Sequence, residues 1–299
     1  MARRDTQPRG GARGAVRLDP SNVRVGGGGR RFQEDCSRGG VGAGTGTQEA
    51  GKYGCERAAT QGPSSEKVGP NVVFDVMSSV GAPVQIGLIE TMRAREGRVP
   101  WLGRHLARIK ASLAALGAPE PRDDLADLVR FAVGYGDRVV RLQLTDGHAE
   151  LATRDVNAEP AISVVLATEA HQPYPHKTTR REQFGRALAN ARRVGANDAL
   201  LATAEGFVAE GTAWNVFWWE NGSLCTPAAD LGILLGLGRA RIMELTDVKE
   251  ARVPVAALAG RSLFITNAVR GIVEVGVFVG APVPRDSRTA ELASGFWPS

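Results

Sequence analysis

Cysteine and histidine are scarce in this chain, and their spacing argues against the usual metal-binding patterns. The 299 residues include three cysteines, Cys36, Cys55 and Cys225, which are odd in number and lie far apart. This spacing gives neither a disulfide framework nor a zinc-type pair, so a reducing, cytoplasmic environment is expected. No two of the four histidines lie three or four residues apart, which excludes a helical His-x-x-x-His site. We therefore predict no metal site.

Long apolar runs are also missing. No stretch approaches the roughly 20 apolar residues that a membrane-spanning helix needs, so no membrane association is expected. The chain begins Met-Ala-Arg-Arg-Asp with no apolar segment behind it, and a secretory signal is therefore not expected either.

Excess positive charge is confined to the start of the chain. Residues 1–70 hold 12 of the 37 basic side chains, 7 of the 32 acidic ones and 16 of the 37 glycines, which leaves the remainder neutral. Such a segment cannot bury enough apolar surface to offset its ordering entropy, so residues 1–76 are predicted to be a disordered tail. We expect it to be a genuine extension or an upstream translation artefact, with Met77 near the functional start. The only aromatic residues among positions 1–70 are Phe32 and Tyr53, which argues against specific nucleic-acid binding.

The residues after the tail predict a small α/β domain over 77–167. A hairpin is expected from strands at 84–94 and 99–102 around Glu96-Gly97-Arg98. Apolar spacing predicts helices over 103–116, which ends at Gly117, and over 123–133. Further strands are expected at 139–145, 148–153 and 162–167.

A proline-containing linker at 168–176 is predicted to separate this domain from a larger one over 177–299. The expected elements are a helix at 179–194, a strand at 199–203, a hairpin of 213–219 with 223–226, a glycine-rich helix over 232–245 and a strand at 262–266. Asn221-Gly222 closes the hairpin with the pair best suited to a type I′ turn. Helices and strands mix without a strict βαβ rhythm, which favours an α+β fold.

A few residues could carry chemistry, although each one alone is more often an ordinary surface or turn residue. Lys177 could form a Schiff base if burial or neighbouring cations lower its pKa. Glu210 lies between strand-like residues. The Gly236–Arg239 segment opens a helix, and free backbone N–H groups at a helix start suit a phosphate. Thr266-Asn267 could add a hydroxyl and an amide, and Arg108 a guanidinium.

The order of the motifs is more informative than any one of them. Taken together, they resemble the class IV pyridoxal-phosphate enzymes, which include branched-chain aminotransferases, D-amino-acid aminotransferases and 4-amino-4-deoxychorismate lyases. The resemblance covers about residues 84–298. The matching blocks are Glu-Thr-Met-Arg (90–93), His-Leu-Ala-Arg-Ile (105–109), His-Lys-Thr-Thr (176–179), Glu-Gly-Thr-Ala-Trp-Asn-Val-Phe (210–217), Thr-Pro (226–227), Gly-Ile-Leu-Leu-Gly-Leu-Gly-Arg (232–239) and Thr-Asn-Ala-Val-Arg-Gly (266–271).

This resemblance implies a two-domain fold type IV enzyme, similar to D-amino-acid aminotransferase, that uses pyridoxal 5′-phosphate (PLP) and forms a homodimer. Lys177 matches the lysine that forms the Schiff base with the cofactor, and Glu210 the acid that pairs with its pyridine nitrogen. Asn215 matches a supporting residue. The positions that match phosphate ligands are Arg108, Leu237, Gly238, Thr266 and Asn267.

Within the family, the His-Lys-Thr-Thr block and the Arg-Arg-Glu-Gln-Phe that follows it resemble the lyase branch. This implies conversion of 4-amino-4-deoxychorismate to 4-aminobenzoate and pyruvate, a step of folate precursor synthesis. A branched-chain or D-amino-acid aminotransferase is the first alternative. A relative without turnover, or a binding protein whose tail contacts RNA, is the second.

Three departures from the family pattern bear on the substrate. Asp146 stands where many relatives have an arginine, Leu235 replaces the usual proline, and Gly238 replaces a frequent phosphate-binding threonine.

Overall fold

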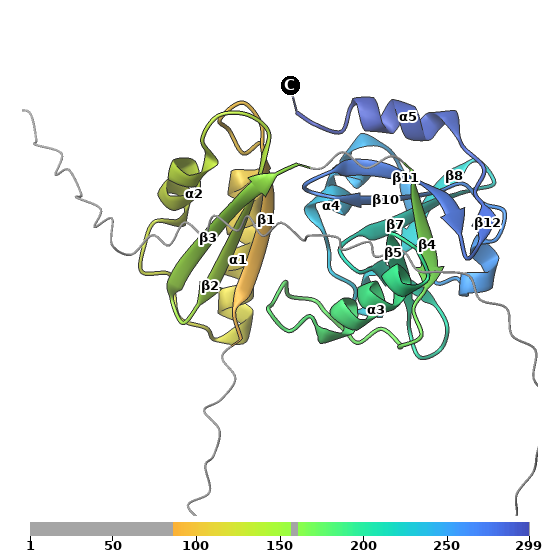
Figure 1. Ribbon diagram of the computed structural model, residues 1–299, viewed down its shortest axis with the longest axis horizontal. Helices are drawn as coiled ribbons and strands as arrows, with labels where there is room; N and C mark the ends of the chain where they lie inside the picture. The colour runs from red at the N-terminus through yellow and green to blue at the C-terminus, as the bar shows by residue number, and fades with distance from the viewer. Residues whose placement is uncertain (1–85, 157–160, 299) are drawn as a thin grey trace, which may run out of the picture. The chain divides into compact units, whose positions relative to one another are not determined.

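A small antiparallel sheet and two helices form the first part of the fold. The computed structural model describes residues 86–156 and 161–298. In this first part the strand order is β1-β2-β3, and helix α1 packs on β1 while α2 packs on β2 and β3 (Figure 1). The elements are β1 (Leu88–Ala94), α1 (Leu102–Leu116), α2 (Leu125–Val133), β2 (Arg138–Thr145) and β3 (His148–Asp155).

The apolar pattern of the sequence accounts for these elements and their packing. Side chains of β1 and β2 that point to one face of the sheet bury against Ile109 and Leu113 of α1 and Val129 of α2. The predicted end of α1 is confirmed, because Gly117 takes a left-handed conformation with φ 59°. Asp124 begins α2, and its side chain accepts hydrogen bonds from two backbone N–H groups of the first turn.

One predicted strand in this region is wrong. Residues 99–102 form no strand, since Arg98 makes only an isolated bridge with Arg95 and helix α1 already begins at Leu102. The tight turn at Glu96-Gly97 is as expected, but it leads directly into the helix.

The second part of the fold is built on a larger mixed sheet of nine strands. Its order is β6-β5-β4-β11-β10-β7-β8-β9, and β12 pairs with β11. β4 runs parallel to both β5 and β11, and β8 is parallel to β9, whereas the other pairs are antiparallel. The strands are β4 (Ile162–Leu166), β5 (Asp198–Ala202), β6 (Val208–Gly211), β7 (Asn215–Glu220), β8 (Ser223–Pro227), β9 (Val248–Ala251), β10 (Leu263–Asn267), β11 (Gly271–Phe278) and β12 (Ala281–Pro282).

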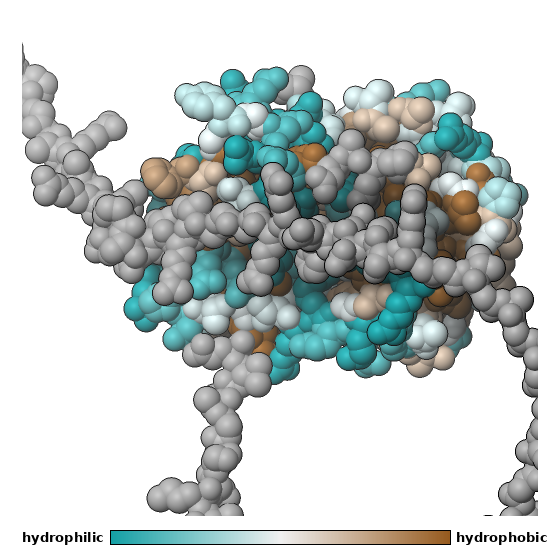
Figure 2. Space-filling view, viewed as in Figure 1, coloured by the Kyte–Doolittle hydropathy of each residue, from teal (hydrophilic) through white to brown (hydrophobic). Residues whose placement is uncertain are grey.

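Apolar cores cover both faces of this sheet. One contains Trp218 and Ile265, and the other contains the stacked rings of Phe217 and Phe264, 5.2 Å apart between centroids. On the face shown in Figure 2, hydrophilic and intermediate residues make up most of the coloured surface. The helices of this part are α3 (Glu182–Arg193), α4 (Leu237–Leu245) and α5 (Ser287–Ser294), with 3-10 turns η2 (Ala229–Leu231) and η3 (Val255–Leu258).

The predicted α+β class is confirmed, as is the hairpin of β7 and β8. Its turn residues Asn221 and Gly222 both have positive φ, 48° and 80°, as a type I′ turn requires. Helix α4 starts five residues later than predicted, because Gly232 ends the 3-10 turn in a left-handed conformation and an irregular loop follows. Strands β6, β9, β11 and β12 and helix α5 have no counterpart among the elements that the sequence predicted.

The predicted domain limits stay a prediction, although the position of strand β4 differs from them. Strand β4, which the limit at 167 assigns to the smaller domain, pairs with strands of the larger sheet. The predicted disordered tail over 1–76 and the proposed start at Met77 lie outside the described residues. Among residues 86–156 and 161–298, no helix is long and apolar enough to cross a bilayer.

Candidate active site

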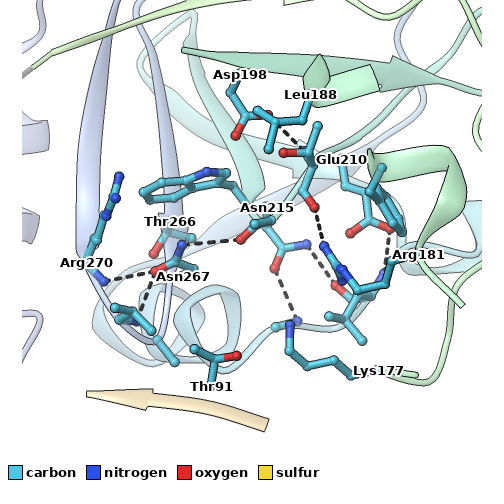
Figure 3. A pocket seen from close by; sticks show the side chains of 18 of the residues that line it. Thr91, Lys177, Arg181, Leu188, Asp198, Glu210, Asn215, Thr266, Asn267 and Arg270 are labelled. Carbon is cyan, nitrogen blue, oxygen red and sulfur yellow. Dashed lines mark hydrogen bonds between the residues drawn. The ribbon is translucent and has the colours of Figure 1, made fainter. Parts of the chain in front are cut away.

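A cavity of about 250 Å³ lies beside the carboxyl end of β10, the start of α4 and strand β6. Figure 3 shows Lys177, Glu210, Asn215, Thr266 and Asn267 around it. Six of the seven residues predicted to act on the cofactor line this cavity, and Gly238 lies directly behind its wall. The six are Arg108, Lys177, Glu210, Leu237, Thr266 and Asn267.

The backbone of Lys177 is attached to the small sheet. Its carbonyl accepts a hydrogen bond from Ile89 N–H at 2.8 Å, and Thr179 N–H donates to the carbonyl of Gly87. Gly87 is required there, since a Cβ atom would lie 2.5 Å from Thr145 Oγ1. These contacts fix the residue that presents the amine, although it belongs to an irregular segment.

The Lys177 amine has an unusual electrostatic environment. Burial is the largest influence, and the nearby positive charges of Arg181 and Arg108 add to it, so that the pKa falls to about 7. Glu90 and Glu210 oppose this shift only in part. A large fraction of the amine is therefore neutral at pH 7 and can act as a nucleophile or base.

Glu210 lies on β6 and is almost completely buried. Both of its hydrogen bonds end on Oε1, from His171 Nε2 at 2.9 Å and from Leu234 N–H at 3.1 Å. Burial raises the pKa of Glu210, and the His171 contact opposes that rise. Because Oε1 holds both donors, Oε2 is left to meet a positively charged group in the cavity.

Asn215 at the start of β7 holds the loop that leads into α4. Its Nδ2 donates to the carbonyl of Leu234 at 2.8 Å, and its Oδ1 accepts from Gly236 N–H at 3.2 Å. A Cβ atom at position 236 would lie 2.3 Å from Oδ1, so only glycine allows this approach. The side chain thus shapes the loop, in line with the supporting role that the resemblance implies.

The start of α4 offers a place for an anion. The helix has no side-chain N-cap, and the N–H groups of its first turn have no acceptor within the helix. Thr266 Oγ1 is buried beside it and has no hydrogen-bond partner among the described residues. Gly238 allows the close approach of α4 to β10, since a Cβ atom there would lie 2.7 Å from Thr266 Oγ1. Free donors and the positive end of the helix dipole favour a phosphate.

Asn267 reaches the same region but is occupied by its own turn. Its Oδ1 accepts from the N–H groups of Val269 and Arg270, both at 2.9 Å, and its Nδ2 donates to the carbonyl of Ala213. The side chain therefore shapes the turn after β10 and does not leave its oxygen free for a ligand.

Arg108 is held by an acid that the sequence did not single out. Glu90 binds it through two short contacts and also contacts His105, and the charged hydrogen bonds outweigh burial to hold the pKa of Glu90 at about 2. His105 and Arg108 are three residues apart on α1, which places them on one helix face. That spacing was visible in the sequence, but nothing indicated that a carboxylate of β1 faced them.

Arg181 was also missed. It donates to the carbonyl of Thr212 at 2.5 Å and lies over the rings of Phe184 and Tyr174. Within the described part of the chain, no group of three or more His, Cys, Asp or Glu side chains could hold a metal ion.

A reactive amine, a buried carboxylate and an anion site at a helix start are the parts that a PLP-dependent enzyme of fold type IV needs. The family model for amino-transferase class IV matches residues 87–277. The chain therefore belongs to the class IV aminotransferase family, and the predicted family and cofactor are confirmed.

Named relatives of the chain include both aminotransferases and a lyase. A "probable branched-chain-amino-acid aminotransferase" from Rickettsia typhi is 27% identical over 207 residues, 57% of this chain and 70% of the relative. A "putative aminodeoxychorismate lyase" from Schizosaccharomyces pombe is 28% identical over 167 residues, 52% of this chain and 72% of the relative.

Solved structures show the same fold. A "putative amino-acid aminotransferase" from Mesorhizobium loti has a TM-score of 0.60 and 29% identity, and the match covers 64% of this chain and 99% of the other. An aminotransferase from Brucella abortus, solved with bound PLP, has a TM-score of 0.62 and 22% identity over 70% of this chain and 87% of the other.

The residues present fit PLP. Lys177 supplies an amine for the cofactor aldehyde, Glu210 Oε2 a carboxylate oxygen for its ring nitrogen, and the start of α4 a set of donors for its phosphate. The unpartnered hydroxyl of Thr266 fits the same phosphate, since a buried hydroxyl without a partner is costly unless a ligand completes it.

Proposed function

We propose that this protein is a lyase that converts 4-amino-4-deoxychorismate into 4-aminobenzoate and pyruvate. The observation that carries the proposal is the charge of the cavity wall, to which five arginines and only two acids contribute. The substrate has two carboxylates, whereas a branched-chain amino acid has one carboxylate and an apolar side chain. The arginines are Arg108, Arg154, Arg181, Arg192 and Arg270, and the acids are Asp198 and Glu210.

In this proposal Lys177 and Glu210 act on the reacting part of the cofactor, and Arg108, Leu237, Gly238 and Thr266 hold its phosphate. When bound, PLP supplies an electron sink for the substrate carbon that carries the amine. Glu210, as a carboxylate next to the ring nitrogen, favours the protonated and more electron-withdrawing ring.

Lys177 Nζ is the proposed base. It accepts the proton from the ring carbon that carries the substrate amine, and the C–O bond on the neighbouring carbon then breaks. The three-carbon fragment leaves as the enolate of pyruvate and takes up one proton to become pyruvate, while the six-membered ring becomes aromatic. The atoms of the substrate divide between the two products, so no second substrate is consumed. The lowered pKa of Lys177 provides a neutral base at pH 7.

The test is a lyase assay on the purified full-length protein. Aminodeoxychorismate is generated in place from chorismate and ammonia by a separate synthase, with 4-aminobenzoate measured by fluorescence and pyruvate by coupled reduction. Equal amounts of both products without an added 2-oxo acid are expected. Lys177→Ala should abolish turnover, and Lys110→Ala, at an exposed lysine of α1, is the matched control.

A branched-chain or D-amino-acid aminotransferase is the alternative, favoured by the apolar lining residues Phe184, Leu188 and Trp214. It would use the same lysine and the same acid. A panel of amino donors with 2-oxoglutarate distinguishes the two functions, because turnover that requires a 2-oxo acid supports the transaminase.

We also propose a homodimer, on the family resemblance. Sedimentation equilibrium of the full chain should give about twice the mass of 31.7 kDa. A concentration-independent monomer would contradict this proposal.

A further inference from the structure

A buried cluster of three ionisable side chains lies behind the cavity. Glu90 of β1 and His105 of α1 are each 1% exposed, and Arg108 completes the cluster at the cavity wall. The Glu90 carboxylate receives Arg108 Nε at 2.7 Å on Oε1 and Arg108 Nη2 at 2.7 Å on Oε2. His105 Nδ1 lies 2.6 Å from the same Oε2.

This arrangement leaves one edge of the guanidinium for the cavity. Glu90 occupies the Nε and Nη2 edge through a paired contact, the geometry that best fixes a guanidinium in a plane. The remaining nitrogen, Nη1, lies 3.5 Å from the carbonyl of Leu235, in the loop that leads into α4. Arg108 therefore directs Nη1 toward the helix start at which the phosphate is proposed to bind.

His105 limits the movement of the carboxylate. It lies one turn before Arg108 on α1, and the burial of its ring leaves little room for another rotamer. The paired acid and histidine thus connect β1 to α1 at the level of the arginine. Without His105, Glu90 could rotate and carry the guanidinium with it.

We propose that Glu90, held by His105, is a positioning residue that directs Nη1 of Arg108 at the cofactor phosphate. This inference rests on the phosphate site proposed above, but not on which reaction the enzyme catalyses. The charge of Glu90 cannot itself attract a phosphate, because like charges repel. Its contribution must therefore be geometric. Removal of the Glu90 charge should then weaken PLP binding, whereas a pure charge effect would strengthen it.

The experiment compares the affinities of the full-length protein for PLP and for pyridoxal, which lacks the phosphate. Both are measured by absorbance titration after removal of the resident cofactor, so no turnover is needed. For Glu90→Gln we expect PLP affinity to fall roughly 10- to 100-fold, by analogy with the loss of a residue that orients a metal ligand. Pyridoxal affinity should stay within about threefold. Glu150→Gln, at an exposed position of β3, is the matched control.

Two outcomes would overturn the proposal. An equal loss of affinity for PLP and pyridoxal would show that Glu90 only maintains the fold. Unchanged PLP binding would show that Glu90 does not position Arg108, and tighter PLP binding would show that its negative charge matters and its geometry does not. Failure of the lyase assay alone would leave this proposal standing, since the two ligands are compared at equilibrium.

A second pair of variants is needed because loss of one partner of a buried ion pair can prevent folding. His105→Ala should reduce the ratio of PLP affinity to pyridoxal affinity, and His105→Asn should restore most of it, since an asparagine amide can donate from nearly the same place. Equal ratios in both variants and the unmodified protein would refute the positioning role. Thermal unfolding of each variant verifies that the folded protein is being compared.

Discussion

Raising the pH of cofactor-free protein should convert the Lys177 amine from its charged to its neutral form with a midpoint at about pH 7. Burial in the cavity wall penalises the ammonium ion, and Arg181 and Arg108 repel it. At pH 7 about half of the Lys177 amine is then neutral, whereas a lysine of the ordinary value has about one neutral amine in three thousand. The two situations differ by a factor of about 1,500 in the reactive form.

Competitive trace labelling with acetic anhydride measures this fraction. The full-length protein, freed of cofactor, is labelled in a series of buffers from about pH 5 to about pH 11, and the modified peptides are quantified by mass spectrometry. Lys110 and Lys249 are exposed and provide internal references in the same samples. The midpoint of the profile is the diagnostic quantity, because a less basic amine is also less reactive once neutral.

The sign of the expected result is fixed by the direction of the pKa shift. Labelling of Lys177 should be weak below the midpoint and reach its plateau above it. A profile that still rises at about pH 10, as for an ordinary lysine, would refute the electrostatic argument for the cavity. Protection at every pH would mean that the amine is closed off, and the proposed role of Lys177 as a base would fail with it.

Three further predictions follow from the geometry. Arg181→Gln should raise the labelling midpoint of Lys177, because it removes a repelling charge; an unchanged midpoint would argue against that influence. Glu210→Gln should retain cofactor absorbance but reduce turnover by about 100-fold, as for loss of one preorganised electrostatic contact, and an unchanged kcat would show that another group faces the ring nitrogen. Gly238→Ala should lower the free energy of unfolding by about 1–3 kcal/mol through overpacking. Gly103→Ala in α1 is the control and should not lower it, because a Cβ atom there meets nothing within 4 Å. Calorimetry of both variants measures the difference.

The sequence predicted best those features that depend on short-range signals. The glycine that ends α1 and the Asn-Gly turn between β7 and β8 each act within a few residues. Strand β11 was not predicted, although Val273, Val275 and Val277 alternate along it. Its pairing with β4 shifts register between Val275 and Val277, which is a tertiary feature that the sequence does not reveal. Residues 99–102 resembled a strand because their side chains are apolar, but they lead into a helix.

The residues of the candidate site also fall into two groups, those that the sequence predicted and those that depend on packing. Lys177, Glu210 and the start of α4 could be found from motif order, since each stands in a block that resembles the family. Glu90 and His105 could not be assigned from those blocks, because a single buried ion pair is defined by packing between β1 and α1 and not by spacing along the chain. Arg181 was missed for a related reason, as its contacts are to a carbonyl and to aromatic rings.

The loop before α4 connects Glu210 to the start of α4 through a series of hydrogen bonds. Its residue Leu234 donates to Glu210 from its N–H group and accepts from Asn215 at its carbonyl. One residue later, the carbonyl of Leu235 meets Arg108, and Gly236 then donates to Asn215 and ends at the helix. A displacement of this loop must therefore move Glu210, the proposed partner of the ring nitrogen, and the proposed phosphate donors together. The missing proline at position 235 bears on this point, because hydrogen bonds from Asn215 and Arg108 supply from outside the rigidity that a proline would supply from within.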